Sequence, residues 1–289
     1  MNRSDDTTLN VRDIRRRFDH AASRFDSADF VHRVARDGLF ARLQPIVVEP
    51  RTVIDLGAAT GAGSRLLERQ FRRAHIIAVD ISHAMLQQVR TSRSWFSRIS
   101  VVQADARALP VSGHSVDLVF ANLILPWIDD LNSVFVEVRR VLRQDGLFLF
   151  STLGPDSLSE LRQAWRTVDT HAHVNNFFDM HDIGDALIGA GLRDPVLDVD
   201  RLAVTYSSVE GLFRDLTMAG ARNSLARRNP ALVSRSRFEA MRSALERHIE
   251  SARPALELEL VYGHCWCMGP QETGAEFHID ARRIGHRRR

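Results

Sequence analysis

The sequence predicts an α/β fold of the Rossmann-like type, in which helices cover a parallel sheet. Apolar runs of strand length alternate with amphipathic segments of helix length between residues 52 and 169. Such alternation favours right-handed crossovers between parallel strands. The chain has 289 residues and is 44% hydrophobic, enough to bury this sheet as one domain with an elaboration.

Each element follows from local signals. Strands are predicted at 52–56, 75–80, 99–104, 116–121 and 146–152, and helices at 62–71, 82–91, 130–143 and 155–169. Ser82 stands where it would cap its helix, and Ser157 with Glu160 has the pattern of a capping box. Beyond residue 180 we expect a helix that ends at 189–191, a strand at about 196–206 and a last strand at about 255–264.

The stretch at residues 53–61 carries the clearest functional signal. An apolar run ends in Asp55, and a small-residue loop from Gly57 to Gly61 leads into a helix. Glycines let the backbone approach a ligand, and a helix N-terminus offers it free N–H groups. The dinucleotide fingerprint needs a second glycine where Ala59 stands, so NAD is disfavoured and another nucleotide-like cofactor is expected.

Acidic residues end three successive predicted strands, namely Asp55, Asp80 and Asp105. In doubly wound folds the acid that ends the second strand accepts the ribose hydroxyls, and this assigns that role to Asp80. Any one of the three has a simpler interpretation as an N-cap or turn residue. The occurrence of all three acids at successive strand ends favours a role in cofactor binding.

Composition and charge exclude several classes of protein. Arginine is the only basic residue besides histidine, and 36 acids leave a net charge of only +3, with no nucleic-acid recognition motif. No apolar stretch is long enough for a membrane span, and the polar N-terminus is no secretory signal. Cys265 and Cys267 form no disulfide framework, which favours the cytoplasm. Together with His264 the two cysteines could suggest a metal site, but a zinc ion needs further ligands and the sequence offers none. We therefore expect these residues to alternate along a strand, with no bound metal.

Several further motifs together point to one family. They are F-D-H-A-A at 18–22, A-N-L-I-L-P-W at 121–127, S-T-L-G-P-D-S-L at 151–158 and H-V-N at 173–175. With the G-x-x-T-G loop and the acidic strand ends, residues 12–266 resemble the malonyl-acyl-carrier-protein O-methyltransferase family of biotin synthesis. The resemblance implies a seven-stranded class I methyltransferase fold that ends in an antiparallel hairpin. It also implies S-adenosylmethionine as the cofactor.

The resemblance implies two sets of site residues. We expect the cofactor to contact Asp55, Gly57, Ala58, Ala59, Thr60, Gly61, Asp80, Ile81, Met85, Asp105, Ala106, Asn122 and Leu123, with Asp105 on the adenine amino group. We expect the acceptor to contact Phe25, Trp127, His173, Asn175 and Arg228.

The acceptor residues also have structural interpretations. Arg228 is the first candidate for the malonyl carboxylate, but it could equally be a solvated charge at a helix end. His173 and Asn175 could form a structural polar cluster, and Trp127 could belong to the core. No catalytic base is expected, because a malonyl carboxylate is already an ionised nucleophile.

The regions outside the alternating core complete the expected organisation. Residues 11–45 are predicted to form amphipathic helices that lie over the cofactor as a lid, or that merely cover a sheet edge. Residues 207–254 form a helical insertion before the last strand, which we expect to build the acceptor site. Residues 1–10 and the Arg-rich tail 271–289 are predicted to be disordered, leaving 11–270 as the methyltransferase domain.

The function implied by the resemblance is methylation of the free carboxylate of malonyl-acyl carrier protein by a monomeric enzyme. The sequence departs from the family at Phe25, Ala59, Pro126 and Asn176, where tyrosine, glycine, glutamine and often arginine are usual. These departures leave two alternatives open. One is a methyltransferase-like assembly factor that hydroxylates an arginine, and the other is a cofactor-binding scaffold without transfer activity.

Overall fold

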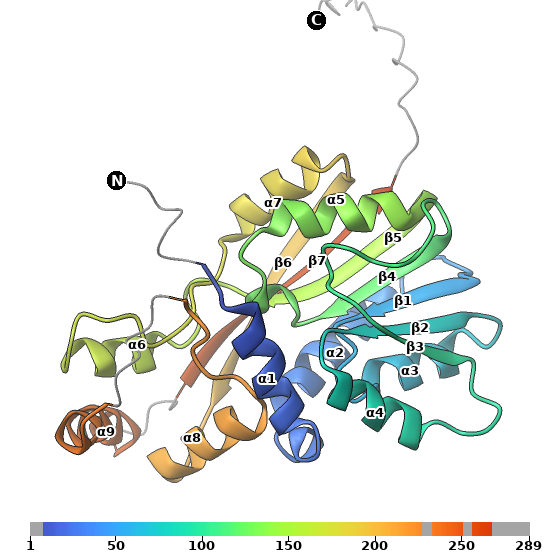
Figure 1. Cartoon of the computed structure of the whole chain (residues 1–289). Helices are drawn as coiled ribbons and strands as arrows, with labels where there is room; N and C mark the ends of the chain where they lie inside the picture. The colour runs from blue at the N-terminus through green and yellow to red at the C-terminus, as the bar shows by residue number, and fades with distance from the viewer. Residues whose placement is uncertain (1–7, 227–232, 251–255, 268–289) are drawn as a thin grey trace, which may run out of the picture.

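A mixed seven-stranded sheet forms the centre of the protein in a computed structural model that describes residues 8–226, 233–250 and 256–267. The strands are β1 (Thr52–Leu56), β2 (His75–Asp80), β3 (Ile99–Gln103), β4 (Val116–Asn122), β5 (Leu142–Leu153), β6 (Arg193–Val204) and β7 (Leu256–Cys267). Their order is β3-β2-β1-β4-β5-β7-β6 (Figure 1). The first five are parallel, and β7 runs antiparallel between β5 and β6. The expected class I methyltransferase fold is confirmed.

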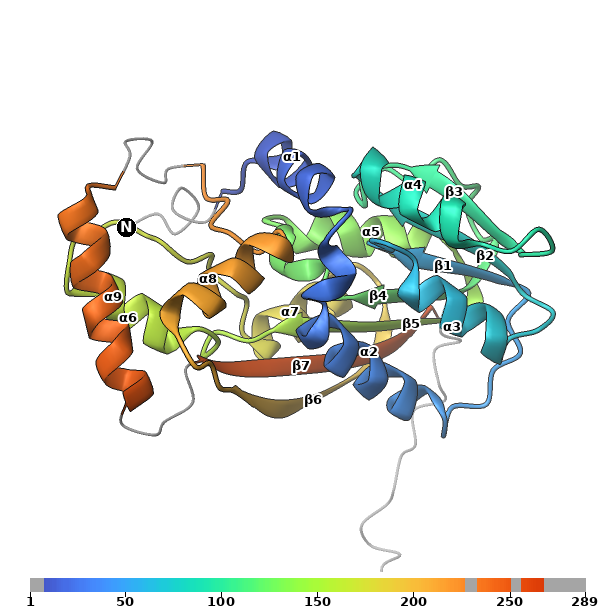
Figure 2. The same ribbon diagram turned by 90° about the horizontal axis from the view of Figure 1, so that it is seen from below.

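Helices cover both faces of this sheet and extend beyond one end of it. They are α1 (Val11–Ala21), η2 (Phe25–Ser27), α2 (Phe30–Leu43), α3 (Ala62–Gln70), α4 (His83–Ser92), η3 (Leu125–Trp127), α5 (Leu131–Val141), α6 (Ser159–Arg166), α7 (Met180–Gly189), α8 (Val209–Met218) and α9 (Arg235–Glu250). α5 and α7 lie on one face, and α2, α3 and α4 lie on the other (Figure 1). α6, α8 and α9 gather past the sheet, in both views (Figures 1 and 2).

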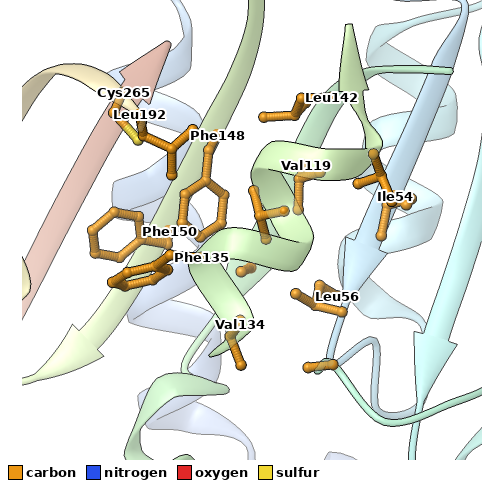
Figure 3. Close-up of a cluster of buried hydrophobic side chains, with 14 of the residues drawn as sticks. Ile54, Leu56, Val119, Val134, Phe135, Leu142, Phe148, Phe150, Leu192 and Cys265 are labelled. Carbon is orange, nitrogen blue, oxygen red and sulfur yellow. The ribbon is translucent and has the colours of Figure 1, made fainter. Parts of the chain in front are cut away.

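The central strands are buried on both faces. Phe135 of α5 packs among Phe148 and Phe150 of β5, whose ring centroids lie 4.9 Å apart (Figure 3). Ile54 of β1 belongs to the same cluster, whereas its neighbour Val53 packs toward α2, α3 and α4. Two buried faces explain why these strands are continuously apolar in the sequence. Each fully buried large side chain contributes about 1.5–3 kcal/mol to folding.

The start of α6 differs from the prediction. The helix begins at Ser159, four residues after the expected start, and the predicted capping box is wrong. The Ser157 hydroxyl instead accepts a hydrogen bond from the Glu259 amide at 2.9 Å, and the Glu160 carboxylate accepts from the Glu257 amide at 3.2 Å. Strand β7, about 100 residues away in the sequence, therefore takes up the polar groups that would have capped α6.

The N-terminal boundary also differs from the prediction. Leu9 is buried and forms an antiparallel bridge with Leu225, and the Asn10 side chain caps α1 by accepting from the Asp13 amide at 3.1 Å. Residues 8–10 thus belong to the fold. Residues 1–7 and the tail 271–289 lie outside the described residues. In the described ranges, no helix combines the length and the apolar character that crossing a membrane would require.

Candidate active site

The loop between β1 and α3 has the backbone that a close ligand contact requires. Gly57 and Gly61 have φ values of 73° and 83°, and a Cβ on Gly57 would lie 2.8 Å from Ile124 Cβ. Ala59 also lies in the left-handed region, with φ 47°, where glycine is favoured. The amides of Gly57 and Ala58 donate to the Val79 carbonyl at 2.8 and 2.9 Å, so β2 fixes the loop.

Asp80, at the end of β2, joins this loop to the start of α4. Its carboxylate accepts from the Ala59 amide at 2.9 Å and from the Ser82 amide at 2.8 Å. Ser82 in turn caps α4 as predicted, because its hydroxyl accepts from the Met85 amide at 3.1 Å. Burial raises the pKa of Asp80 to about 6.

A first cavity of about 90 Å³ opens at the carboxyl ends of β1, β2 and β4. Its lining includes many of the expected cofactor residues, namely Gly57, Ala59, Asp80, Ile81, Asp105, Ala106, Asn122 and Leu123. Val11, Ile14, Phe18 and Phe25 also line it and come from the N-terminal segment. Carboxyl strand ends are where open α/β sheets bind ligands, so the strand-end motifs and this cavity agree in position.

The remaining expected cofactor residues belong to the loop or pack near it, and they do not line the cavity. Asp55 is 2% exposed and accepts from the Ser64 hydroxyl at 2.5 Å, and burial raises its pKa to about 6. The Thr60 hydroxyl donates to Asp26, and Met85 is buried in the cluster that contains Phe25. Ala58 and Gly61 also lie outside the lining. The geometry gives these residues a supporting role for the loop.

Asp105 lines the cavity but is already paired. The Arg107 guanidinium donates to its two carboxylate oxygens at 3.0 and 2.7 Å, and this hydrogen bonding lowers the pKa of Asp105. Arg107 lines the cavity too and lies 3.9 Å from Asp129. Arg107 was not predicted as a site residue. Its position two residues after Asp105 was the signal in the sequence that could have identified it.

Two carboxylates fasten the N-terminal segment to the cofactor loop. Asp19 of α1 accepts from the Ser82 hydroxyl at 2.6 Å and from the Ala84 amide at 3.2 Å. Asp26 of η2 accepts from the Thr60 hydroxyl at 2.5 Å. These hydrogen bonds attach the N-terminal helices to the loop and to the start of α4. Their role as a lid stays a prediction.

A second and larger cavity, of about 490 Å³, lies beside the first, under α8 and α9. Three of the expected acceptor residues line it: Trp127, His173 and Asn175. Phe25 lines the first cavity instead, with its ring centroid 4.9 Å from that of His32. Arg228 lies outside the described residues.

His173 and Asn175 line the cavity and are also held by neighbours. The His173 ring stacks on Trp165 at 3.8 Å between centroids, and its Nε2 lies 2.8 Å from an Asp169 carboxylate oxygen. The Asn175 side-chain oxygen accepts from the Ser224 amide at 2.9 Å. The structural polar cluster considered from the sequence therefore exists, and it forms part of the cavity wall.

Two arginines that the sequence analysis did not assign to the site also line the second cavity. Arg17 of α1 donates to the Ser224 hydroxyl at 3.1 Å and to the Asn223 carbonyl, and Arg222 follows α8. Arg17 comes directly before the F-D-H-A-A motif, which was the signal available. Within the described ranges, no group of three or more His, Cys, Asp or Glu side chains is placed to hold a metal ion.

The two cavities share part of their walls. His32, Leu123 and Trp127 line both of them. The Phe18 and Trp127 rings meet edge to face, 5.1 Å apart, and so close the first cavity beside this junction. The two cavities are therefore adjacent at these three residues.

Comparisons with known proteins identify the family. A family model described as a methyltransferase domain matches residues 54–150. The malonyl-acyl-carrier-protein O-methyltransferase of Halorhodospira halophila is 41% identical over 297 residues, covering 100% of both chains. That of a Methylovorus strain is 39% identical over 259 residues, covering 88% of each.

Solved structures match the fold. The YcgJ protein of Bacillus subtilis superposes with a TM-score of 0.58 at 16% identity, covering 80% of this chain and 98% of that one. The fold, the methyltransferase domain and the full-length similarity lead to the same assignment. The chain belongs to the malonyl-acyl-carrier-protein O-methyltransferase family of S-adenosylmethionine-dependent enzymes.

Proposed function

We propose that this protein transfers the methyl group of S-adenosylmethionine to the free carboxylate of malonyl-acyl carrier protein, at the start of biotin synthesis. The observation that carries the proposal is the shared wall of His32, Leu123 and Trp127 between the two cavities. This wall makes the two cavities neighbours, as a cofactor site and an acceptor site for direct transfer must be. The identity of the acceptor rests on the family.

The residues of the first cavity fit S-adenosylmethionine. Its mostly apolar wall suits an adenine ring, and Asp80 offers a carboxylate to ribose hydroxyls at the end of β2. The glycine at position 57 keeps the loop backbone open to a ligand, because a side chain there would press on Ile124. When bound, the cofactor supplies an activated methyl group on its sulfonium.

The chain itself would act by positioning. An ionised carboxylate needs no base, so the reaction needs the acceptor oxygen in line with the methyl–sulfur bond at close approach. Apolar side chains, among them Phe30, Leu161 and Phe177, form most of the second cavity and would keep water from the carboxylate. Among the described cavity residues, Arg17 and Arg222 could balance the acceptor's negative charge.

The carrier protein would dock beside the insertion at residues 207–254. Acyl carrier proteins are acidic, and Arg222 lies at the second cavity, with Arg227 and Arg228 following in the sequence. The role of Arg228 on the malonyl carboxylate stays a prediction, as do the monomeric state and the cytoplasmic location. Electrostatic complementarity of this kind mainly raises the association rate.

Methyl transfer can be tested with the purified chain, labelled S-adenosylmethionine and malonyl-acyl carrier protein. We expect the intact mass of the carrier to increase by one methyl group. Acetyl-acyl carrier protein is the matched control, because it lacks the free carboxylate and should stay unlabelled. Cofactor binding without methylation of the malonyl form would contradict the proposal and favour a scaffold, and addition of oxygen to a protein arginine would favour the hydroxylase.

A further inference from the structure

We propose that Asp215 binds the arm that carries the methyl acceptor, by accepting a hydrogen bond from an amide N–H of that arm, and that Tyr206 holds the Asp215 carboxylate in place for this contact. The inference rests on the proposed function, because it takes the second cavity as the acceptor site. It names a subsite for the arm, which neither the motifs of the chain nor the comparisons assign.

Both residues lie in the wall of the second cavity and outside that of the first. Asp215 belongs to α8, within the insertion beside which the carrier would dock, and Tyr206 lies in the segment between β6 and α8. Each side chain is only half-buried, and neither residue lines the first cavity. A ligand in the second cavity can therefore reach them, whereas a cofactor in the first would not contact them.

Asp215 places a carboxylate on an apolar part of this wall. The other cavity residues of α8 are Phe213 and Leu216. Within the described ranges, no ion pair joins Asp215 to an arginine or a histidine. A carboxylate on an apolar wall is stable only when hydrogen-bond donors surround it. A ligand that fills this cavity and excludes water must therefore bring a donor of its own.

Tyr206 is the partner that the chain itself provides. Burial, then the negative charge of Asp215 and a hydrogen bond with it, raise the pKa of Tyr206 to about 12. The phenol therefore keeps its proton near pH 7 and donates to the carboxylate. An ionised carboxylate can accept roughly four hydrogen bonds, so this contact orients Asp215 and leaves capacity for a ligand.

The arm of an acyl carrier protein has the matching chemistry. A carrier presents its acyl group on a pantetheine arm, and each secondary amide of that arm offers an N–H donor. The malonyl end carries a negative charge, which the Asp215 carboxylate repels. The arm, and not the malonyl end, is therefore the part of the acceptor that suits a place beside α8.

A cation at another part of the same wall completes this orientation. Arg17 of α1 also lines the second cavity, and the next residue, Phe18, lines the first. The centroid of the Phe18 ring lies 5.1 Å from that of Trp127, which lines both cavities. The wall thus carries a positive charge on the side of the cofactor cavity and a negative charge on the side of the insertion. This arrangement directs the malonyl carboxylate toward the first cavity and the arm toward α8.

Carriers with different arms test this contact. One is malonyl-acyl carrier protein with its natural arm, and the other has an arm whose amides are replaced by esters, which removes the N–H donors and keeps nearly the same shape. We expect the wild type to prefer the amide arm by about 10- to 100-fold in kcat/KM, the range for a hydrogen bond to a charged group. In Asp215→Ala this preference should shrink to within about twofold, because the acceptor of the hydrogen bond is gone.

Further variants separate the hydrogen bond from charge and packing. Asp215→Asn keeps a carbonyl acceptor without the charge, so it should show an intermediate preference. Tyr206→Phe removes the hydroxyl that orients the carboxylate and should lower the preference by less than Asp215→Ala. Glu210→Ala is the matched control, because it removes a carboxylate from the same helix but lines neither cavity, and it should keep the full preference. The Kd for S-adenosylmethionine should stay within about twofold of the wild-type value in every variant.

The outcomes separate the inference from the function on which it rests. If the wild type does not methylate the natural carrier, the proposed function is contradicted and the inference is lost with it. If the wild type methylates both carriers with equal kcat/KM, no hydrogen bond from the arm contributes to turnover and the inference alone is overturned. This comparison needs no variant, so it holds even if a substitution prevents folding. An Asp215→Ala protein that binds the cofactor normally and keeps the full preference for the amide arm would also overturn the inference.

Discussion

Asp80 links cofactor binding to pH at the scale of a single residue. Burial raises its pKa from 3.8 to about 6. In the role predicted for Asp80, ribose hydroxyls would donate to the ionised carboxylate. Binding should therefore favour the ionised form and release a proton near pH 6. We predict that the affinity for S-adenosylmethionine falls as the pH is lowered through 6, approaching about tenfold per pH unit, as titration calorimetry would measure.

Two variants show whether Asp80 is the group responsible. Asp80→Asn should bind more weakly at pH 7 and lose the dependence near pH 6. Asp55→Asn is the matched control, because the pKa of Asp55 is also raised to about 6 but its side chain does not line the cavity. A pH dependence that survives in Asp80→Asn would contradict the assignment.

The same raised pKa acts in the opposite direction on folding. Between pH 3.8 and about 6, the folded protein holds a proton on Asp80 that the unfolded chain has released. The contribution of Asp80 to the stability of the cofactor-free protein is therefore present at low pH and is lost as the pH rises through this window. Bound cofactor should oppose this loss by stabilising the ionised carboxylate.

The acidic strand ends show which residues sequence can locate. Asp80 ends β2 and Asp105 lies two residues after the end of β3, and both line the cavity. Their contacts with the cofactor stay a prediction. Asp55 lies one residue before the end of β1, and strand alternation turns it toward Ser64 of α3. His32 could not be found in this way, because its position depends on how α2 crosses the ends of β4 and β5.

At the scale of elements, the N-terminal segment is attached to the cofactor site by side chains. Asp19 holds the start of α4, and Asp26 holds the cofactor loop. Replacing both by Ala should loosen this attachment and weaken S-adenosylmethionine binding, chiefly by faster dissociation. Each lost hydrogen bond should cost about 0.5–1.5 kcal/mol, which stopped-flow release of the cofactor would show.

A control variant separates this effect from a general loss of charge. Asp37→Ala also removes one carboxylate from the N-terminal segment, but Asp37 is exposed on α2. Its cofactor release should match the wild type. If the Asp19 and Asp26 variants also release the cofactor at the wild-type rate, the segment is a cover for the sheet and not a lid, as one interpretation of the sequence allowed.

The elements also show where local signals fail. Ser82 caps α4 as its position predicted, since the cap needs only residues three positions apart. Ser157 and Glu160 have an equally good local pattern for a cap. In the structure, however, both side chains accept hydrogen bonds from backbone amides of β7. A capping motif is therefore reliable only where no distant strand reaches the helix start.

At the scale of the whole molecule, the second cavity brings together distant parts of the chain. Arg17 comes from α1, His173 from the segment after α6, and Arg222 from the insertion between β6 and β7. The sequence predicted these segments separately, through the N-terminal helices, the H-V-N motif and the long insertion. Their meeting depends on long-range contacts, such as the hydrogen bonds of Ser224 with Arg17 and with Asn175, which no local pattern in the chain specifies.

The last prediction tests how strongly the whole fold depends on β7. This strand lies between β5 and β6, and its Gly263 faces Phe150 of β5 and Leu197 of β6. A Cβ at this position would overlap both side chains. Phe150 belongs to the central core and cannot move without disturbing Phe135 and Phe148.

Gly263→Ala should therefore lower the free energy of unfolding by about 1–3 kcal/mol, the usual cost of overpacking a close-packed interior. Gly189→Ala is the matched control, because nothing lies within 4 Å of a Cβ at the end of α7. That change should leave stability unchanged or raise it by less than about 1 kcal/mol. Urea denaturation of the three proteins measures both effects, and equal midpoints for the two variants would contradict the tight packing of β7.

Because β7 also forms part of the second cavity through Leu256 and Leu258, the Gly263→Ala enzyme should lose acceptor turnover at a lower urea concentration than the Gly189→Ala enzyme.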